Sequence, residues 1–443
     1  MDIILIKALQ FFASLSLLVL IHEFGHYIAA RIFKIRVEKF YIFFNPWFTL
    51  YKRKVGQTEY GVGWLPLGGY VSLSGMIDES MNTEQMKLPP QPWEFRTKPA
   101  WQRLIVMLAG VIMNVLFAMF IYSVILFTWG EDYLRNDDVQ YGYVFNEGGE
   151  NIGFVDGDRI VSIDGEHIER AEQIGPKIIV SGNARSVEVL RDGELVSFDI
   201  PLDEIVALRE NGQYKGLYSP LADPFIVESV EAERAFEAGY VAGDQVVAVN
   251  GVSMRSGMEI REALLQHKGS MVDVTVLRDG ASQVVLPSLI DTAGRIGIRI
   301  VDVEAPRTTH ISYGFFESIP AGIKLAGKEI ASYWEQLKMI VNPDTKLYKE
   351  VGGFISIGSV FPDTWDWESF WRLTALISII LAVMNILPIP GLDGGHALFT
   401  LWEIITRRKP SDKFLEVMQW IGLAILFALL LYANGSDIIK LFN

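Results

Sequence analysis

Hydrophobic and polar residues are distributed in large blocks along the 443-residue chain. Four stretches are apolar over about 20 residues each, at roughly 3–29, 103–128, 370–388 and 415–433. A helix of this length can cross the roughly 30 Å hydrocarbon core of a membrane. A buried helix of a water-soluble enzyme could show the same pattern once, but four such stretches favour a membrane protein. We therefore predict four transmembrane helices.

The region between the second and third apolar stretches carries a repeat. GFVDGDRIVSIDGEHI at 153–168 matches GYVAGDQVVAVNGVSM at 239–254, and VEVLRDGE at 187–194 matches VTVLRDGA at 274–281. Two matched blocks indicate two copies of one small domain, and short β-branched runs between Gly-Asp turns predict mostly strands. The pattern resembles PDZ domains, which bind extended peptides or chain ends. The copies could equally serve as spacers or steric shields.

Charge and cysteine content restrict the possible functions. The chain contains no cysteine, so a metal site must use His, Asp or Glu. Its net charge of −14 argues against nucleic acid as a partner. Basic residues follow the first apolar stretch, precede the second and separate the third from the fourth, whereas acids follow the second. This distribution predicts that residues 30–102 and 389–413 face the cytosol and that both termini and the central region lie outside.

The first apolar stretch contains HEFGH at 22–26, where two histidines and an acid interrupt an apolar helix. A charged group at the bilayer centre costs about 3 kcal/mol or more, so these side chains need a partner. In H-E-x-x-H on a helix, His22 and His26 share one face and can bind one zinc ion. Glu23 can then take a proton from water. A histidine pair satisfied inside a helix bundle is the alternative, but Glu23 would also need a partner there.

A catalytic zinc site needs a third protein ligand, because its fourth position is kept for water. Asp393 is our candidate, in NILPIPGLDGGH at 385–396, directly after the third apolar stretch. Broken helices at membrane depth occur where the backbone is buried in protein or lines a wet cavity. Glu403 is a competing ligand near a basic cluster and is expected at the surface. His396 is a weaker competitor and is expected to pack or to support the site.

These motifs together resemble the site-2 protease family, in the branch that includes the bacterial regulator of sigma-E protease. The resemblance covers nearly the whole chain and rests on HExxH, on N-x-x-P-x-P-x-L-D-G and on the tandem PDZ-like copies between them. The matching positions are His22, Glu23, His26, Asn385, Pro388, Pro390, Leu392, Asp393 and Gly394. The first copy departs from the pattern at NIGF, 151–154, which puts its peptide groove in doubt.

The resemblance implies an intramembrane zinc metalloendopeptidase with one zinc ion. His22, His26 and Asp393 would hold the metal, and Glu23 would act as general base and then as acid. Asn385 would stabilise the oxyanion or hold the substrate backbone. A helix–helix hydrogen bond is the alternative role for that amide.

The segment EYGVGWLPLGGYVSL at 59–73 bears on substrate binding. Its glycines and Pro66 predict a hairpin that dips toward the active site and offers a strand edge to an extended substrate. In the family this segment is a membrane-re-entrant hairpin; an ordinary cytosolic loop is the alternative. The expected substrate-binding residues are Gly61, Gly63, Leu67, Gly68, Gly69, Asn114, Pro388 and Pro390.

We expect a polytopic α-helical membrane protein with four transmembrane helices, a membrane-re-entrant β-hairpin and two mostly-β extracytoplasmic PDZ domains. Residues 313–340 show helical periodicity but are too polar to span, so we predict amphipathic helices at the outer membrane surface. The expected divisions are 1–130 with the first two membrane helices, 131–220 and 221–305 for the PDZ domains, 306–365 for the amphipathic helices, and 366–443 for the last two membrane helices.

The resemblance also implies partners and a location. The expected substrates are single-span membrane proteins, of the kind of anti-sigma factors already trimmed by a first protease in the envelope stress response, and remnant signal peptides. Membrane lipid and peptide ends at the PDZ domains are further expected partners, and nucleic acid is not. The protein is expected in the bacterial inner membrane, with its PDZ domains and termini periplasmic and its active site toward the cytosol. Alternatives are a catalytically silent PDZ scaffold, a membrane metal transporter and a soluble-type zincin tethered to the membrane.

Overall fold

The computed structural model of the chain consists of two compact units. It describes residues 3–76, 88–221, 225–254, 257–279, 282–300 and 308–442. The first unit is built mainly from long helices and contains residues 1–131, 312–343 and 347–443. The second unit is built mainly from short strands and contains residues 132–311 and 344–346.

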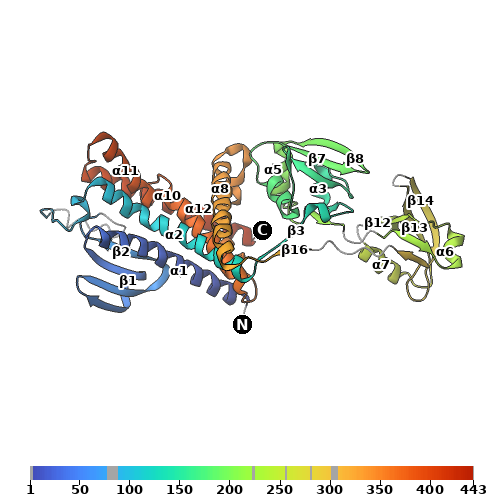
Figure 1. Cartoon of the computed structure of the whole chain (residues 1–443), viewed down its shortest axis with the longest axis horizontal. Helices are drawn as coiled ribbons and strands as arrows, with labels where there is room; N and C mark the ends of the chain where they lie inside the picture. The colour runs from blue at the N-terminus through green and yellow to red at the C-terminus, as the bar shows by residue number, and fades with distance from the viewer. Residues whose placement is uncertain are drawn as a thin grey trace. The chain divides into compact units, whose positions relative to one another are not determined.

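The first unit contains one β-hairpin and a group of helices (Figure 1). Its strands are β1 (Val37–Val55) and β2 (Thr58–Leu73). Its α-helices are α1 (Ile3–Ile32), α2 (Ala100–Thr128), α8 (Phe315–Val341), α9 (Phe354–Ser359), α10 (Trp367–Ile386), α11 (Asp393–Thr406) and α12 (Asp412–Phe442).

The second unit contains short strands and short helices. Its strands are β3 (Glu131–Leu134), β4 (Tyr143–Phe145), β5 (Arg159–Ile163), β6 (Glu166–His167), β7 (Arg185–Arg191), β8 (Glu194–Ile200), β9 (Tyr218–Pro220), β10 (Val227–Val230), β11 (Gln245–Val249), β12 (Val252–Ser253), β13 (Met271–Arg278), β14 (Ser282–Leu289), β15 (Ile298–Ile300) and β16 (Thr308–Ile311). Its α-helices are α3 (Glu147–Asn151), α4 (Ile174–Ile179), α5 (Leu202–Glu210), α6 (Glu233–Ala238) and α7 (Gly257–Gln266).

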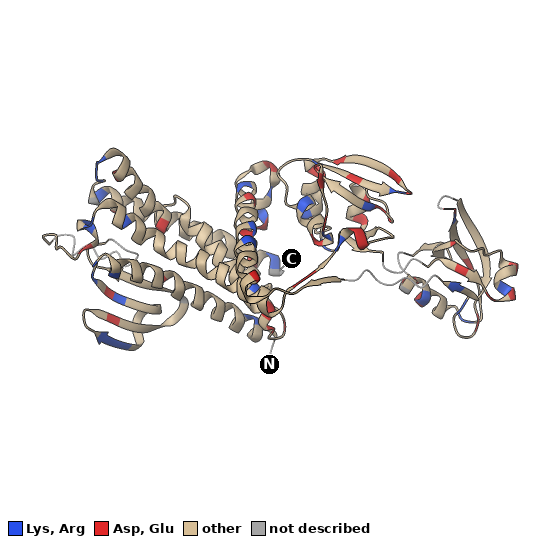
Figure 2. Cartoon of the chain, in the orientation of Figure 1, with Lys and Arg blue, Asp and Glu red and all other residues tan. Residues whose placement is uncertain are grey.

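The four apolar stretches are helices. Among the residues that the structure describes, α1, α2, α10 and most of α12 are long and apolar enough to cross a membrane. Figure 2 shows few charges along these helices and many along α8. The third helix ends at Ile386, earlier than the predicted 388, because a residue that precedes a proline is disfavoured in helical conformation and Leu387 precedes Pro388.

Glycines allow close contacts between the helices of this unit. A Cβ atom on Gly25 of α1 would lie 2.4 Å from the carbonyl oxygen of Ala109 in α2. A Cβ atom on Gly322 of α8 would lie 2.4 Å from the backbone nitrogen of Ser123 in α2. Neither position can carry a larger side chain without a shift of the backbone. Small residues at such contacts are typical of helix packing in membranes.

The predicted hairpin has different boundaries from those expected. Residues 59–73 do not form a hairpin by themselves; they lie within the single strand β2, which pairs antiparallel with β1 across a turn at Gly56 and Gln57. The β1 segment is rich in aromatic and β-branched residues, which favour strands, and our sequence analysis did not assign it. Its pairing is interrupted between Phe44 and Thr49, where Trp47 has a positive φ of 69°. Whether the hairpin re-enters the membrane stays a prediction.

The second unit contains two four-stranded sheets with matching strand orders, β6-β5-β7-β8 and β12-β11-β13-β14. In the first, Arg191 donates to both carboxylate oxygens of Asp158 and to the Gly153 carbonyl. In the second, Arg278 makes the same contacts with Asp244 and Gly239. Each arginine therefore ties a strand to the Gly-Asp turn found in the sequence. The assignment of the two copies as PDZ domains stays a prediction.

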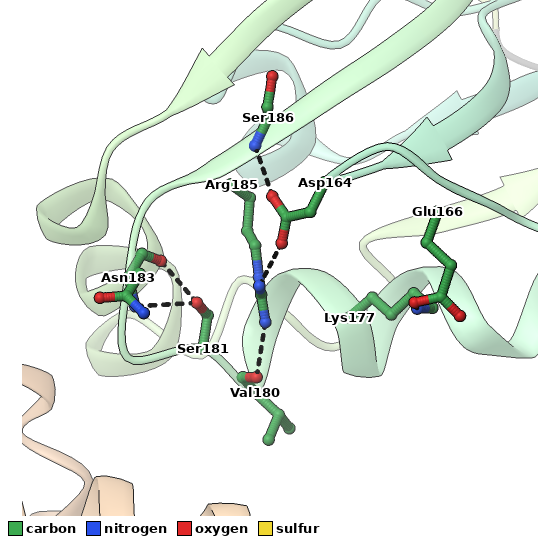
Figure 3. Close-up of polar contacts among 8 residues, drawn as sticks. All are labelled: Asp164, Glu166, Lys177, Val180, Ser181, Asn183, Arg185 and Ser186. Carbon is green, nitrogen blue, oxygen red and sulfur yellow. Dashed lines mark hydrogen bonds and ion pairs between the residues drawn. The ribbon is translucent and has the colours of Figure 1, made fainter.

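A second turn also matches between the two sheets. Figure 3 shows Asp164, which follows β5, accepting hydrogen bonds from the Ser186 amide and from Arg185. At the corresponding turn after β11, Asn250 accepts a hydrogen bond from the Asp273 amide at 3.0 Å. Asp164 and Asn250 have φ values of 53° and 50°, which Asp and Asn tolerate better than most residues. The Asp-Gly and Asn-Gly pairs in the repeat are thus turns of one geometry.

Helix α8 occupies the segment for which amphipathic helices were predicted. One of its faces packs on α2 and α10 in a cluster that includes Ala118, Tyr122, Ala326, Ala375 and Ile379. The helix is continuous from Phe315 to Val341 despite Pro320, which lies in its second turn. Its position at a membrane surface stays a prediction.

We predict that Asp244→Asn destabilises the second four-stranded sheet by about 1–3 kcal/mol, the usual cost of losing hydrogen bonds to a charged group. Burial raises the pKa of Asp244, but hydrogen bonds from Arg278 and the Val241 amide outweigh it and lower the pKa below its ordinary value. A carboxylate with a lowered folded-state pKa stabilises the fold above its unfolded pKa of about 3.9. The difference between wild type and variant should therefore be full at pH 7 and shrink as the pH falls below about 4.

Urea-dependent proteolysis of the detergent-purified protein, with the cleavage sites mapped by mass spectrometry, would measure this difference. Asp279→Asn is the matched control, because Asp279 is exposed and lies in a turn with a positive φ that Asn accepts. Equal resistance of Asp244→Asn and Asp279→Asn would contradict a stabilising role for the Asp244–Arg278 pair.

Candidate metal centre

His22 and His26 lie on one face of α1, four residues apart. Their ring centroids are 4.9 Å apart, and the rings are nearly perpendicular at 81°. The Nε2 atoms of the two rings lie 3.2 Å from each other. The helical spacing predicted from the sequence therefore brings two nitrogen ligands to one point.

Asp393 reaches this point because the chain turns sharply after α10. Leu387 to Leu392 form a tight connection in which Gly391 has a φ of 92°, and α11 then begins at Asp393. A Cβ atom on Gly394 would lie 2.2 Å from the Leu387 carbonyl oxygen, so only glycine fits there. Asp393 thus lies in the first turn of α11, where the helix dipole favours a negative charge.

The carboxylate of Asp393 faces both histidines. Its Oδ2 atom lies 3.1 Å from Nε2 of His22 and 3.3 Å from Nε2 of His26. These three atoms form the one group of potential metal ligands found among the described residues. The third ligand expected from the sequence is therefore in position.

This donor set fits a metal ion. Nδ1 of His26 lies 2.8 Å from the carbonyl oxygen of Val106, which can only accept a hydrogen bond. Nδ1 therefore carries a proton, so that Nε2 is the nitrogen of His26 available to a metal ion. Nε2 faces the Asp393 Oδ2 atom, which is buried among these side chains. Two imidazoles with one carboxylate match the donor set of a catalytic zinc site.

Helix α2 packs directly against both rings. A Cβ atom on Gly110 would lie 2.5 Å from Nε2 of His26 and 2.7 Å from Cε1 of His22. One turn further along α2, the Nδ2 atom of Asn114 lies 3.4 Å from Nδ1 of His22. The backbone of α2 thus forms the wall behind the two histidines.

Glu403, the competing ligand, is used elsewhere. Its carboxylate pairs with Arg103 of α2 at 2.5 Å, and both side chains are mostly buried. Arg103 also donates to the Lys98 carbonyl. The acid is therefore not the solvated surface residue that we expected, and it ties the middle of α11 to the start of α2.

A cavity of about 610 Å³ lies at this candidate ligand group. Glu23 and Asn385 line it together with His22, His26 and Asp393. The hairpin contributes a wall that includes Phe44, Asn45, Gly68, Gly69 and Tyr70. Glu23 is thus close to the ligands, in a space large enough for a peptide segment.

The cavity contains only some of the expected substrate-binding residues. Gly68, Gly69 and Asn114 line it, whereas Gly61, Gly63, Pro388 and Pro390 are not among its lining residues. The glycines outside it have packing roles: a Cβ atom on Gly61 would lie 2.3 Å from the Tyr41 ring, and one on Gly63 would lie 2.1 Å from the Phe44 carbonyl oxygen. The side chain of Leu67 lies outside what the structure describes.

Three lining residues were missed or left open by the sequence analysis. His396 lines the cavity and forms a hydrogen bond with Gln419 of α12, which lines it too. Asn45 accepts a hydrogen bond from Tyr70 and donates one to Thr49. Gln419 was detectable in principle, because a polar residue within an apolar span is a functional candidate. Asn45 lay in a strand that the sequence analysis did not assign.

Comparison with known proteins identifies the family. The sequence profile of Peptidase family M50 matches residues 10–429. The chain belongs to peptidase family M50. The resemblance to site-2 proteases drawn from HExxH and LDG is thereby confirmed, and four apolar helices in an M50 peptidase agree with a membrane location.

Similar proteins extend over the full length of this M50 chain. A protein of Vibrio cholerae named as a zinc metalloprotease is 30% identical over 99% of both chains. A protein of Treponema pallidum with the same name is 26% identical over 99% of this chain and 100% of its own. The regulator of sigma E protease of Haemophilus influenzae is 26% identical over 98% of both. These names describe metalloproteases and agree with a ligand group that can hold zinc.

We predict that Gly110→Ala weakens zinc binding, because the added methyl group would displace both histidine rings. Changes next to metal ligands commonly cost about 10–100-fold in affinity, and we expect a loss in that range. Competition with a chromophoric chelator would measure it. Gly327→Ala, in α8, is the matched control, since a Cβ atom there meets nothing within 4 Å. Equal affinities for the two variants would contradict the close contact of α2 with the ligands.

We further predict opposite effects at Asp393 and Glu403. Asp393→Ala should lose bound zinc after mild chelation, because one of three ligands is gone. Glu403→Ala should keep zinc but lower the melting temperature, because the buried Arg103 charge loses its partner. Elemental analysis and thermal unfolding would separate the two. Zinc loss in Glu403→Ala but not in Asp393→Ala would indicate that Glu403 is the third ligand.

Proposed function

We propose that the chain is an intramembrane zinc metalloendopeptidase that cleaves single-span membrane proteins within or near their transmembrane segments. The observation that carries this proposal is the position of Glu23, which lines one cavity with His22, His26 and Asp393 although α1 is an apolar helix. An acid inside a membrane helix is costly in free energy. Beside a group that can hold a metal ion, it can act as a general base in hydrolysis, which would explain its presence.

A zinc ion held by His22, His26 and Asp393 would supply Lewis-acid activation of water and of the substrate carbonyl. Glu23 would accept the proton of the attacking water and deliver it to the leaving amine nitrogen. Asn385, in the last turn of α10, lines the same cavity and would donate its amide hydrogen to the developing oxyanion.

The hairpin supports binding of an extended substrate. A helix hides its backbone hydrogen-bonding groups, so a membrane helix must unwind before a protease can cleave it. Residues 39–42 of β1 pair with β2 on both sides, at 69–72 and at 59–62, whereas residues 69–72 pair with β1 on one side only among the described residues. Gly68 and Gly69 of β2 line the cavity. Strand addition at this edge would place an unwound substrate segment beside Glu23.

The proposed substrates are of the anti-sigma-factor kind, since a relative over the full length of the chain is a regulator of sigma E protease. Remnant signal peptides are a second proposed substrate class, because they too are single apolar helices. The proposed location is a bacterial inner membrane with the cavity toward the cytosol, where basic residues gather near the ends of the spans.

We predict that Glu23→Gln keeps the fold and the zinc content but lowers the cleavage rate at least about a hundredfold, the scale of general acid–base catalysis. The measurement is cleavage of a single-span substrate by purified protein in proteoliposomes. Glu416→Gln in α12 is the control, because Glu416 does not line the cavity. Cleavage by Glu23→Gln at the wild-type rate would show that Glu23 is not the general base.

A further inference from the structure

Asn114 of α2 has an unusual position for a polar side chain. The residue is completely buried, and its Oδ1 atom has no hydrogen-bond partner in the described structure. Its Nδ2 atom instead lies 3.4 Å from Nδ1 of His22. A buried acceptor without a partner costs about 1–3 kcal/mol, so this arrangement needs an explanation.

The tautomer of His22 that metal binding requires supplies an explanation for the position of Asn114. Nε2 of His22 points at Asp393 and His26, so a metal bound there would take the Nε2 lone pair and leave the proton on Nδ1. An Nδ1–H donor would then face the Nδ2–H donor of Asn114. Rotating the amide by 180° exchanges its oxygen and nitrogen without changing its shape. Oδ1 would then accept the proton of Nδ1, which replaces a contact between two donors with a hydrogen bond.

His26 shows the same arrangement already formed. Its Nδ1 atom lies 2.8 Å from the Val106 carbonyl oxygen, which is also on α2. Gly110 lies between Val106 and Asn114 and brings the helix close enough for both contacts. Helix α2 would therefore present one oxygen acceptor to each histidine.

We propose that Asn114, expected from the sequence to contact substrate, is a positioning residue that fixes the tautomer and ring orientation of His22. The proposal rests on the proposed metal centre. Partners of this type on metal-bound histidines are commonly carbonyl or carboxylate oxygens. The backbone of Asn114 is held within α2 itself, and Ser378 of α10 makes an additional hydrogen bond to its carbonyl oxygen at 2.8 Å.

The test compares zinc affinity and the visible spectrum of the Co²⁺-substituted protein across variants of the full chain. Asn114→Leu removes the acceptor at similar volume and should weaken zinc binding about 10–100-fold and alter the Co²⁺ bands. Asn114→Asp keeps an oxygen acceptor and should recover most of the affinity. Ser378→Ala disturbs the same helix contact without touching the amide and should leave the spectrum unchanged.

Unchanged affinity and an unchanged Co²⁺ spectrum in Asn114→Leu would overturn the positioning role while leaving the metal centre intact. Absence of zinc binding in the wild type would overturn both. If Asn114→Leu does not fold, Asn114→Ala carries the same expectation. Equal losses in Ser378→Ala and Asn114→Leu would show a packing role only and would also overturn the proposal.

Discussion

The close contact between α1 and α2 is the constraint on which the metal centre depends. Gly25 lets the Ala109 carbonyl approach α1, and Gly110 lets the backbone of α2 lie against both histidine rings. Apolar burial gives little drive for helices to associate inside a membrane, because lipid is as apolar as their surfaces. Close backbone contact through small residues can provide this driving force for association instead. The same contact brings Val106 and Asn114 within reach of the histidines.

The polar groups of the helical unit follow a second constraint, since each needs a partner in apolar surroundings. Arg103 pairs with Glu403, Ser378 donates to the Asn114 carbonyl, and His396 bonds Gln419. These links join α2 to α11, α10 to α2 and α11 to α12. Residues that looked isolated in the sequence are therefore the connections between helices.

Sequence reasoning succeeded where the signal was local or repeated. The apolar stretches and the histidine pair four residues apart need only helix geometry and length, and the structure contains both. Asp393 was proposed from the LDG motif instead, and it lies beside the two histidines. It failed where pairing over distance decides the structure. The partner strand of 59–73 was not assigned, because residues 37–55 contain both aromatic and basic residues without strict alternation. The pairing of Glu403 with Arg103 joins residues 300 positions apart, and no local pattern reports it.

The candidate metal ligands come from two segments that are distant in the sequence, α1 and the start of α11, and the groups behind them come from a third, α2. A cation held by His22, His26 and Asp393 would therefore act as a tie between helices as well as a reagent, since the free energy of metal binding also stabilises the structure that forms the site. The Asp393 carboxylate is held in the first turn of α11 by glycines that permit no side chain. The tight connection before α11 therefore restricts the movement of Asp393, and a side chain that is to hold a catalytic metal ion needs such a fixed position.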